Sequence, residues 1–208
     1  MADRVKVHMN RGRVGIEFLE TLSGYFSLGV TDPELGAVQG ERRGRIFAIH
    51  NVVSVLDVTT FCQDRKAAAE LEVRVDFAPF GTGIATETGT FHLFVPAHDP
   101  PASLMIYRFG LVHEGSRYFF EGIKTMRARW SAMRLWRQST RLYSRLHRGS
   151  DASGPVVGAG ILTIRPTGSL AMARSMHTVG RGTALERALG MARFQRFLAD
   201  GFWQALRY

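Results

Sequence analysis

The chain has 208 residues, of which 45% are hydrophobic and 22% charged, and its single cysteine, Cys62, excludes an intramolecular disulfide. A chain of this length buries roughly 70% of its unfolded surface and folds without a metal or disulfide staple. No apolar run reaches the roughly 18 residues of a membrane-spanning helix, and the N-terminus lacks the apolar core of a signal peptide. We therefore expect a cytoplasmic protein with one domain over residues 1–208.

The formal net charge is +9, and nearly all of it comes from arginine. The arginines are scattered rather than gathered in a basic run, which favours a solvated surface over a nucleic-acid site. Trp130, Trp136 and Tyr143 lie among arginines, as in a platform for single-stranded nucleic acid, but no nucleic-acid motif accompanies them. We expect no nucleic-acid partner, and a basic adaptor for an anionic surface remains an alternative.

The first predicted strand covers about residues 13–29 and has one apolar face, from Val14 to Phe26 in steps of two. Glu20 lies in the middle of that face. A carboxylate on a buried face is costly unless it is paired or hydrogen-bonded, so Glu20 is the first candidate functional residue.

Seven further segments alternate in the same way and are separated by turn-rich stretches such as residues 30–43, which contain Pro33, Gly36 and Gly40. Short strands that follow one another without intervening helices predict an antiparallel meander, and eight of them favour a closed barrel of the lipocalin or calycin type. The predicted segments are about 44–57, 67–77, 84–96, 103–113, 117–126, 135–147 and 155–165.

The segment at residues 135–147 is ambiguous. Arg134, Arg137 and Arg141 recur at helical spacing, whereas Leu142, Ser144 and Leu146 alternate as in a strand, and propensity alone favours a helix.

The C-terminal part is predicted to be helical, over about residues 169–178 and 183–206. Ser169 is the expected N-cap of the first helix. Thr183 and Glu186 have the capping-box spacing at the start of the second helix, which is amphipathic and is expected to pack on the sheet or plug the barrel.

Several short segments together resemble the accessory, non-flavin-binding region of bacterial cholesterol-oxidase-like flavoproteins of the glucose-methanol-choline group. The resemblance implies that residues 136–147 form a strand, and that the partner pathway handles sterols or other lipids, with an oxidoreductase as partner. The chain has no Gly-x-Gly-x-x-Gly fingerprint, so no cofactor is expected. The resembling segments are Phe18–Tyr25, Tyr107–Arg108, Phe120–Lys124, Trp136 with Ser139–Leu142, Gly158–Leu162 and Phe194–Tyr208.

Two more charged residues lie on strand faces that look apolar: Arg108, and Glu121 on the following strand. A two-residue turn at Glu114-Gly115 would place Arg108 directly opposite Glu121. Three interpretations remain open for Glu20, Arg108 and Glu121. They can be read as a buried ion-pair network inside the barrel, as a polar anchor for a ligand, or as a catalytic site in which Glu20 or Glu121 is the general acid–base.

Lys124 and His92 are expected near this polar end, since His92 shares a face with threonines that could line a cavity. Gly158 and Gly160 on one strand indicate either a hollow lumen or a tight barrel corner. The histidine spacings do not match a zinc site, Gly-x-Ser-x-Gly is absent, and Cys62 is expected to be an inert thiol, so neither a metal nor a nucleophile is expected.

The sequence therefore predicts a barrel that binds a small apolar or amphipathic ligand, lipid-like or sterol-like. The polar end of the ligand would lie at Glu20, His92, Arg108, Glu121 and Lys124. The alternative is a cofactor-independent enzyme, such as an isomerase or cyclase, that uses Glu20 or Glu121 as acid–base.

Overall fold

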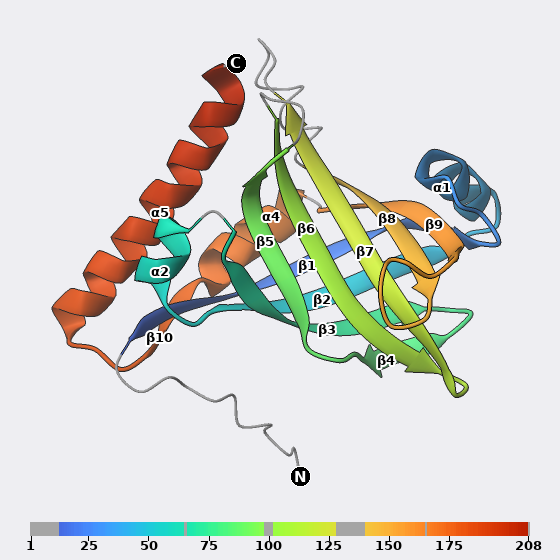
Figure 1. Cartoon of the computed structure of the whole chain (residues 1–208), viewed down its shortest axis with the longest axis horizontal. Coiled ribbons are helices and arrows are strands. Elements are labelled where there is room, and N and C mark those ends of the chain that lie inside the picture. Colours follow the sequence, from blue (N-terminus) through green and yellow to red (C-terminus); the bar gives the residue numbers. More distant parts are fainter. Residues whose placement is uncertain (1–12, 65, 98–101, 128–139, 165, 208) are drawn as a thin grey trace.

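The structure is a computed structural model that describes the chain except for residues 1–12, 65, 98–101, 128–139, 165 and 208 (Figure 1). Strands dominate it. The elements in chain order are β1 (Val14–Leu28), α1 (Pro33–Arg42), β2 (Ile46–Val55), α2 (Val58–Gln63), β3 (Ala68–Phe77), β4 (Gly81–Ala85), β5 (Gly89–Pro96), β6 (Ala102–His113), β7 (Ser116–Arg127), β8 (Arg141–Arg148), β9 (Val156–Thr163), α4 (Pro166–Ser175), β10 (His177–Gly180) and α5 (Ala184–Arg207).

Eight antiparallel strands close into a barrel in the order β1-β2-β3-β5-β6-β7-β8-β9, and β9 pairs back with β1. β1 is long enough to pair with two further strands besides β2: Ser23–Leu28 pair with β9, and Val14–Glu17 pair with β10. β4 is a further short strand beside β3. Closure provides partners for backbone groups that an open sheet would leave at its edges. The predicted antiparallel barrel of about eight strands with C-terminal helices is confirmed.

The arginine-rich segment that was ambiguous in the sequence is a strand where the structure describes it. In β8 the side chains of Leu142, Ser144 and Leu146 are buried, and Tyr143 and Arg145 between them point outward. Residues 135–139 of the predicted strand, with Trp130 and Trp136, lie outside the described residues. Tertiary burial of a period-2 apolar face thus overrides helix propensity here.

The prediction of one continuous strand over residues 84–96 is wrong, since residues 86–88 separate β4 from β5. Both strands pair with β3, but at opposite ends of it. Between them the backbone N–H of Glu87 donates to the carbonyl of Gly110 in β6, so the chain leaves β3 at this point.

Helix α1 forms within residues 30–43, which are predicted from the sequence to be a turn-rich connection. Asp32 caps it by accepting from the backbone N–H of Leu35 at 2.8 Å, and Pro33 takes the first helical position, where no N–H is needed. Gly36 and Gly40 let the helix lie directly on the barrel backbone. A Cβ on Gly36 would come within 2.1 Å of the carbonyl oxygen of Ala159, and one on Gly40 within 2.5 Å of the backbone nitrogen of Phe26.

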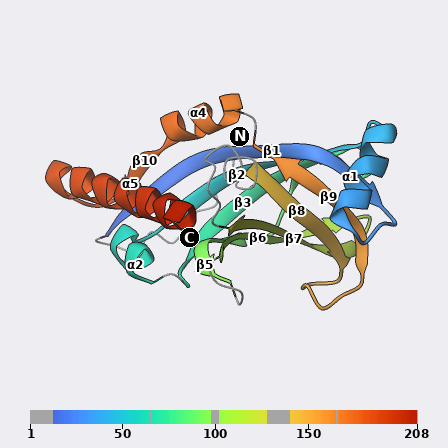
Figure 2. The same ribbon diagram turned by 90° about the horizontal axis from the view of Figure 1, so that it is seen from above.

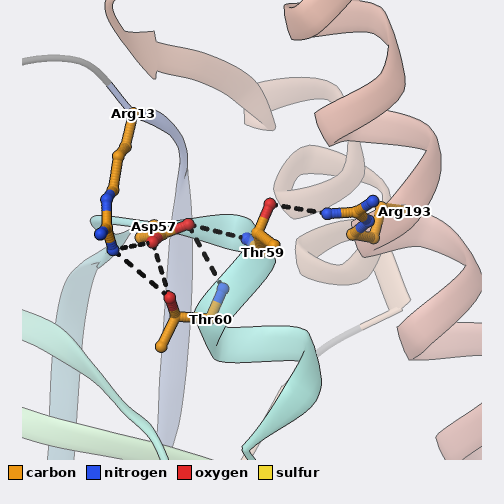
Figure 3. A network of polar contacts seen from close by, with 5 residues as sticks. All are labelled: Arg13, Asp57, Thr59, Thr60 and Arg193. Carbon is orange, nitrogen blue, oxygen red and sulfur yellow. Dashed lines mark hydrogen bonds and ion pairs between the residues drawn. The ribbon is translucent and has the colours of Figure 1, made fainter.

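The short helix α2 is tied to both ends of the chain by a polar network (Figure 3). Asp57 is its N-cap and accepts from the backbone N–H groups of Thr59 and Thr60 and from the guanidinium of Arg13. These bonds keep the pKa of Asp57 below its usual value, although burial opposes the shift. Arg193 on α5 donates to the hydroxyl of Thr59 at 2.6 Å, so the network connects α2 with α5 and, through Arg13, with the residue that precedes β1.

The two C-terminal helices are present close to their predicted bounds. The capping box is confirmed, since the backbone N–H of Thr183 donates to Glu186 at 2.6 Å and that of Glu186 donates to the hydroxyl of Thr183 at 3.2 Å. Ser169 is not an N-cap, because α4 already begins at Pro166. In the described parts of the chain no helix has the length and apolar character needed to cross a membrane.

The helices lie at opposite ends of the molecule. α1 is at one end, and α5 with α2 is at the other (Figures 1 and 2). α4 packs along β1. The two ends of the barrel are therefore covered by different elements, and their interiors differ accordingly.

Candidate functional site

Phenylalanine rings fill the half of the barrel next to α1. Phe47 and Phe120 stack with their ring centroids 5.6 Å apart, and Phe120 also stacks on Phe109 at 4.6 Å. Phe26 and Phe77 complete this cluster. A Cβ on Gly158 or Gly160 would come within 2.7 Å of the Phe26 ring, so these glycines mark tight packing rather than a hollow lumen.

The other half of the barrel interior contains a partly enclosed cavity of about 220 Å³. Its wall combines strands of the barrel with residues of α4 and α5. Its charged groups lie where Glu20, Tyr107 and Lys124 meet, and apart from Thr140 the rest of its wall is apolar. The remaining lining residues are Phe18, Phe91, Leu93, Met105, Thr140, Ile164, Met172, Met176, Leu198 and Phe202.

A bulge in β5 shapes the side of the cavity that faces α5. The register between β5 and β6 shifts after His92, and Phe94 has a positive φ of 57°. As a result both Leu93 and Phe94 are buried, where regular alternation would turn one of them outward. Phe94 then packs against Phe202 of α5, with ring centroids 5.4 Å apart. The bulge thus fixes α5 over the barrel.

Glu20, Tyr107 and Lys124 form a compact buried cluster at one end of this wall. The hydroxyl of Tyr107 donates to Oε2 of Glu20 at 2.9 Å, and Nζ of Lys124 donates to that hydroxyl at 3.2 Å. Nζ also lies 3.5 Å from Oε1 of Glu20 and 5.1 Å from the centre of the Tyr107 ring. All three side chains are less than 7% exposed. The carboxylate that the sequence left unexplained is therefore paired with a cation and hydrogen-bonded to a phenol.

The electrostatics of the cluster keep Tyr107 in its protonated form. Burial raises its pKa well above 10, and the neighbouring carboxylate of Glu20 adds to the shift because it repels a phenolate and accepts the phenol's hydrogen bond. Tyr107 consequently remains a donor to Glu20 throughout the physiological pH range.

Arg108 and Glu121 do not join this cluster. They are direct cross-strand partners, as predicted, and the guanidinium donates to Oε1 of Glu121 at 2.9 and 2.7 Å. However, the buried face of β6 carries Tyr107 and its alternate neighbours, so Arg108 and Glu121 lie on the outside of the barrel. The expected interior network of Glu20 with Arg108 and Glu121 is therefore wrong. Both faces of β6 are largely apolar, which is why alternation alone selected the wrong one.

His92 also lies on the outer face, because its neighbours Phe91 and Leu93 are buried and it pairs with Ile106 of β6. Of the five residues predicted at the polar end, the structure brings together Glu20 and Lys124. In the described part of the chain, no group of three or more His, Cys, Asp or Glu side chains is arranged to hold a metal ion.

Sequence reasoning missed two polar neighbours of Glu20, Tyr107 and Asn51. Asn51 is 2% exposed, lies on the inward face of β2 between Ile49 and Val53, and is the direct cross-strand partner of Glu20. Its position opposite the one acidic residue on the buried face of β1 was a usable signal, but detecting this position requires the pairing register of β1 and β2. Tyr107 was detectable as the polar member of an aromatic face.

A second polar arrangement lies on the outside of the barrel. Nδ1 of His50 is 3.2 Å from the hydroxyl of Thr21, and Nε2 is 3.0 Å from Oδ2 of Asp76. The order hydroxyl, imidazole, carboxylate matches that of a catalytic triad, but the His50 and Asp76 side chains are 45% and 41% exposed. Water screens such a row, so it contributes cross-strand hydrogen bonds rather than an activated nucleophile.

No family model, curated protein or solved structure matches this chain. The cavity and the buried cluster in its wall are therefore the features from which a function can be inferred.

Proposed function

We propose that this protein binds a small amphipathic molecule inside the barrel, with its apolar part against the wall of the 220 Å³ cavity and its polar end at Glu20, Tyr107 and Lys124. One observation carries the proposal. A hollow with an almost entirely apolar wall has all its charged groups in one corner, which is the arrangement that orients an amphipathic ligand.

The volume of the cavity limits the size of the ligand. At about 220 Å³ it lies below the roughly 300–1,000 Å³ of pockets that enclose drug-sized ligands. A short alkyl or terpenoid chain satisfies this limit. A complete sterol exceeds it unless α4 and α5 move outward. We therefore favour a small lipid-like molecule over a sterol.

The wall is suited to chains of varied shape. Met105, Met172 and Met176 contribute flexible, polarisable side chains that adapt to irregular ligands. On this proposal the protein acts as a carrier or accessory for an enzyme that oxidises lipids. That partner is suggested by the resemblance to the accessory region of cholesterol-oxidase-like flavoproteins.

Occlusion of the cavity tests the proposal. Leu198→Trp places a larger ring in the cavity wall, and Leu185→Trp makes the same change at an exposed position of α5 as a matched control. We expect 1-hexanol, titrated into labelled protein and followed by NMR, to shift cavity resonances in the wild type and in Leu185→Trp. We expect the binding to weaken at least tenfold in Leu198→Trp. Equal binding by both variants would refute a site in this cavity, as would the absence of a co-purifying or added ligand in native mass spectrometry.

A second candidate function follows from the same cluster. Glu20, Tyr107 and Lys124 supply a carboxylate, a phenol and an ammonium within hydrogen-bonding reach of one another on a cavity wall, and such groups can move protons to and from a substrate. A cofactor-independent isomerase or cyclase would use Glu20 in this way. Glu20→Gln separates the two functions, since an enzyme would lose turnover while keeping ligand affinity.

A further inference from the structure

The side of α5 that faces away from the barrel carries a stripe of exposed and mostly apolar side chains. Leu185 is 69% exposed, Leu189 60% and Trp203 55%, whereas Phe194 on the opposite side of the helix is fully buried. α5 forms one edge of the molecule, so this stripe faces outward (Figures 1 and 2). Steps of four and three residues place the members of the stripe on one helix face. We call this face the α5 ridge, and it consists of Leu185, Leu189, Ala192, Arg196, Ala199 and Trp203.

A cleft with three arginines lies beside the N-terminal half of the ridge. It has a volume of about 440 Å³ and lies between α5, α2 and the start of β1. Its cationic groups are Arg13, Arg181 and Arg193, of which the first and last are seen in Figure 3. Leu189 of the ridge belongs to the wall of the same cleft. The apolar ridge and the cationic cleft therefore form one continuous surface.

The two carboxylates of the cleft are already committed to local contacts. Asp57 accepts from Arg13 and from two backbone N–H groups of α2. Glu186 accepts from the backbone N–H and the hydroxyl of Thr183 in the capping box. Within the described chain neither carboxylate forms an ion pair with the two remaining arginines of the cleft. Those two positive charges are consequently left for a group from outside.

The same two arginines have unused hydrogen-bond donors. A guanidinium carries five N–H donors. Arg193 uses one of them toward the hydroxyl of Thr59, and Arg181 has no hydrogen-bond or ion-pair partner in the part of the chain that the structure describes. Planar guanidinium groups bind phosphate oxygens with two parallel hydrogen bonds. The cleft thus offers both charge and geometry for a phosphate group.

A second copy of the chain is a poor occupant of the ridge. In an antiparallel pair of α5 helices centred on the ridge, Arg193 would lie near Arg196 of the copy. The acidic residues would meet in the same way, Glu186 near Asp200 of the copy. Like charges that face each other repel, and the net charge of +9 on each chain adds to the repulsion.

An anionic bilayer matches both parts of the surface. Its hydrocarbon accepts leucine and tryptophan side chains, and its headgroups supply phosphates to arginine. We infer that the α5 ridge docks on a membrane that contains anionic phospholipids. Leu185, Leu189 and Trp203 lie among the upper parts of the acyl chains, and Arg181 and Arg193 hold headgroup phosphates in the cleft.

The same helix covers the cavity with its other side. Leu198 and Phe202 of α5 line the cavity, so docking would bring the cover of the cavity next to the bilayer, where amphiphilic molecules reside. The docking does not depend on the proposed function, because it uses the outer side of α5.

Co-sedimentation with vesicles tests the inference in the absence of any added ligand. Vesicles of phosphatidylcholine alone are compared with vesicles of phosphatidylcholine and phosphatidylserine at about 3:1. We expect wild-type protein to bind the anionic vesicles at least tenfold more tightly, and the affinity to fall as salt is added. Equal binding to both kinds of vesicle would overturn the inference, as would an α5-mediated dimer that does not bind vesicles.

Two pairs of variants locate the surface. Leu189→Glu should lose at least tenfold in affinity for the anionic vesicles, whereas Leu35→Glu, which adds the same charge at a 51% exposed position of α1, should bind nearly as tightly as the wild type. Arg181→Gln should lose about fivefold, the contribution of one basic residue at an anionic surface, and Arg42→Gln on α1 should lose less. Equal losses within either pair would overturn docking through α5.

Tryptophan fluorescence gives a readout of insertion. We expect the emission to shift to shorter wavelength when the wild type binds anionic vesicles, and Trp203→Phe to reduce this shift, because Trp203 moves from water into the bilayer. An undiminished shift in Trp203→Phe would contradict insertion of the ridge. Failure of these vesicle experiments leaves ligand binding in the cavity untouched, and failure of 1-hexanol to bind leaves the docking untouched.

Discussion

Removing either charge of the Glu20–Lys124 pair should strongly destabilise the protein. Lys124 is 3% and Glu20 6% exposed, so Lys124→Met leaves a carboxylate, and Glu20→Gln an ammonium, without its counter-charge in a dry interior. Breaking a buried pair from one side costs about 3–5 kcal/mol, whereas removing both charges costs far less. The double variant should therefore recover most of the loss.

The expected change in melting temperature follows from chain length. At about 2.1 cal/mol/K per residue, 208 residues give an unfolding entropy of roughly 0.4 kcal/mol/K, so each single variant should melt about 7–11 °C below the wild type. Urea unfolding of all four proteins gives the double-mutant cycle. Arg108→Met, which breaks the partly exposed outer pair with Glu121, is the control and should cost less than about 1 kcal/mol. Single variants within 1 kcal/mol of the wild type, or strictly additive losses, would refute a buried charge pair.

Three further results are expected. Because the pKa of Tyr107 is raised in the folded state, its contribution to stability is complete below pH 10 and declines as pH rises toward the folded pKa. In Tyr107→Phe the free energy of unfolding in urea should therefore fall less steeply above pH 10 than in the wild type. Parallel plots of this free energy against pH for the two proteins would contradict the prediction. Burial raises the pKa of Cys62 to about 11, so it should react slowly with a disulfide reagent at pH 8 until guanidinium unfolds the chain, whereas a rapid native reaction would show an accessible thiolate. Gly40→Ala should lower the melting temperature, because the added Cβ meets the backbone of Phe26. Val38→Ala, on the exposed face of α1, is the control and should leave the melting temperature unchanged. Equal melting temperatures for the two variants would mean that α1 does not pack directly on the barrel.

The barrel was predictable because its strands carry a period-2 signal that local sequence expresses directly. Glu20 was detectable for the same reason, since one acidic residue interrupts an otherwise apolar alternation. The inward face of β6 could not be identified from the sequence, because both of its faces carry large apolar residues: Ile106 and Val112 on one face, and Tyr107 and Phe109 on the other. Larger aromatic side chains bury more surface, and this decides the face in the folded protein.

Helix α1 could not be predicted from local sequence either. Pro33, Gly36 and Gly40 are locally turn-forming, and the sequence gives no indication that another backbone lies against the two glycines. Their small size becomes favourable only when α1 packs on β1 and on β9, and β9 lies more than 100 positions further along the chain. Asn51 was missed for a related reason, since its significance depends on the residue that it faces across the sheet.

The mixed composition of the cavity wall has a kinetic consequence. Leu198 and Phe202 belong to α5, whereas the strands around the cavity are hydrogen-bonded into a closed ring. Separating strands would break a ladder of backbone bonds, whereas shifting α5 breaks side-chain packing and side-chain hydrogen bonds such as that from Arg193 to Thr59. A ligand should therefore enter and leave the cavity at the rate at which α5 transiently separates from the barrel. A bound ligand should in turn slow amide hydrogen exchange along α5.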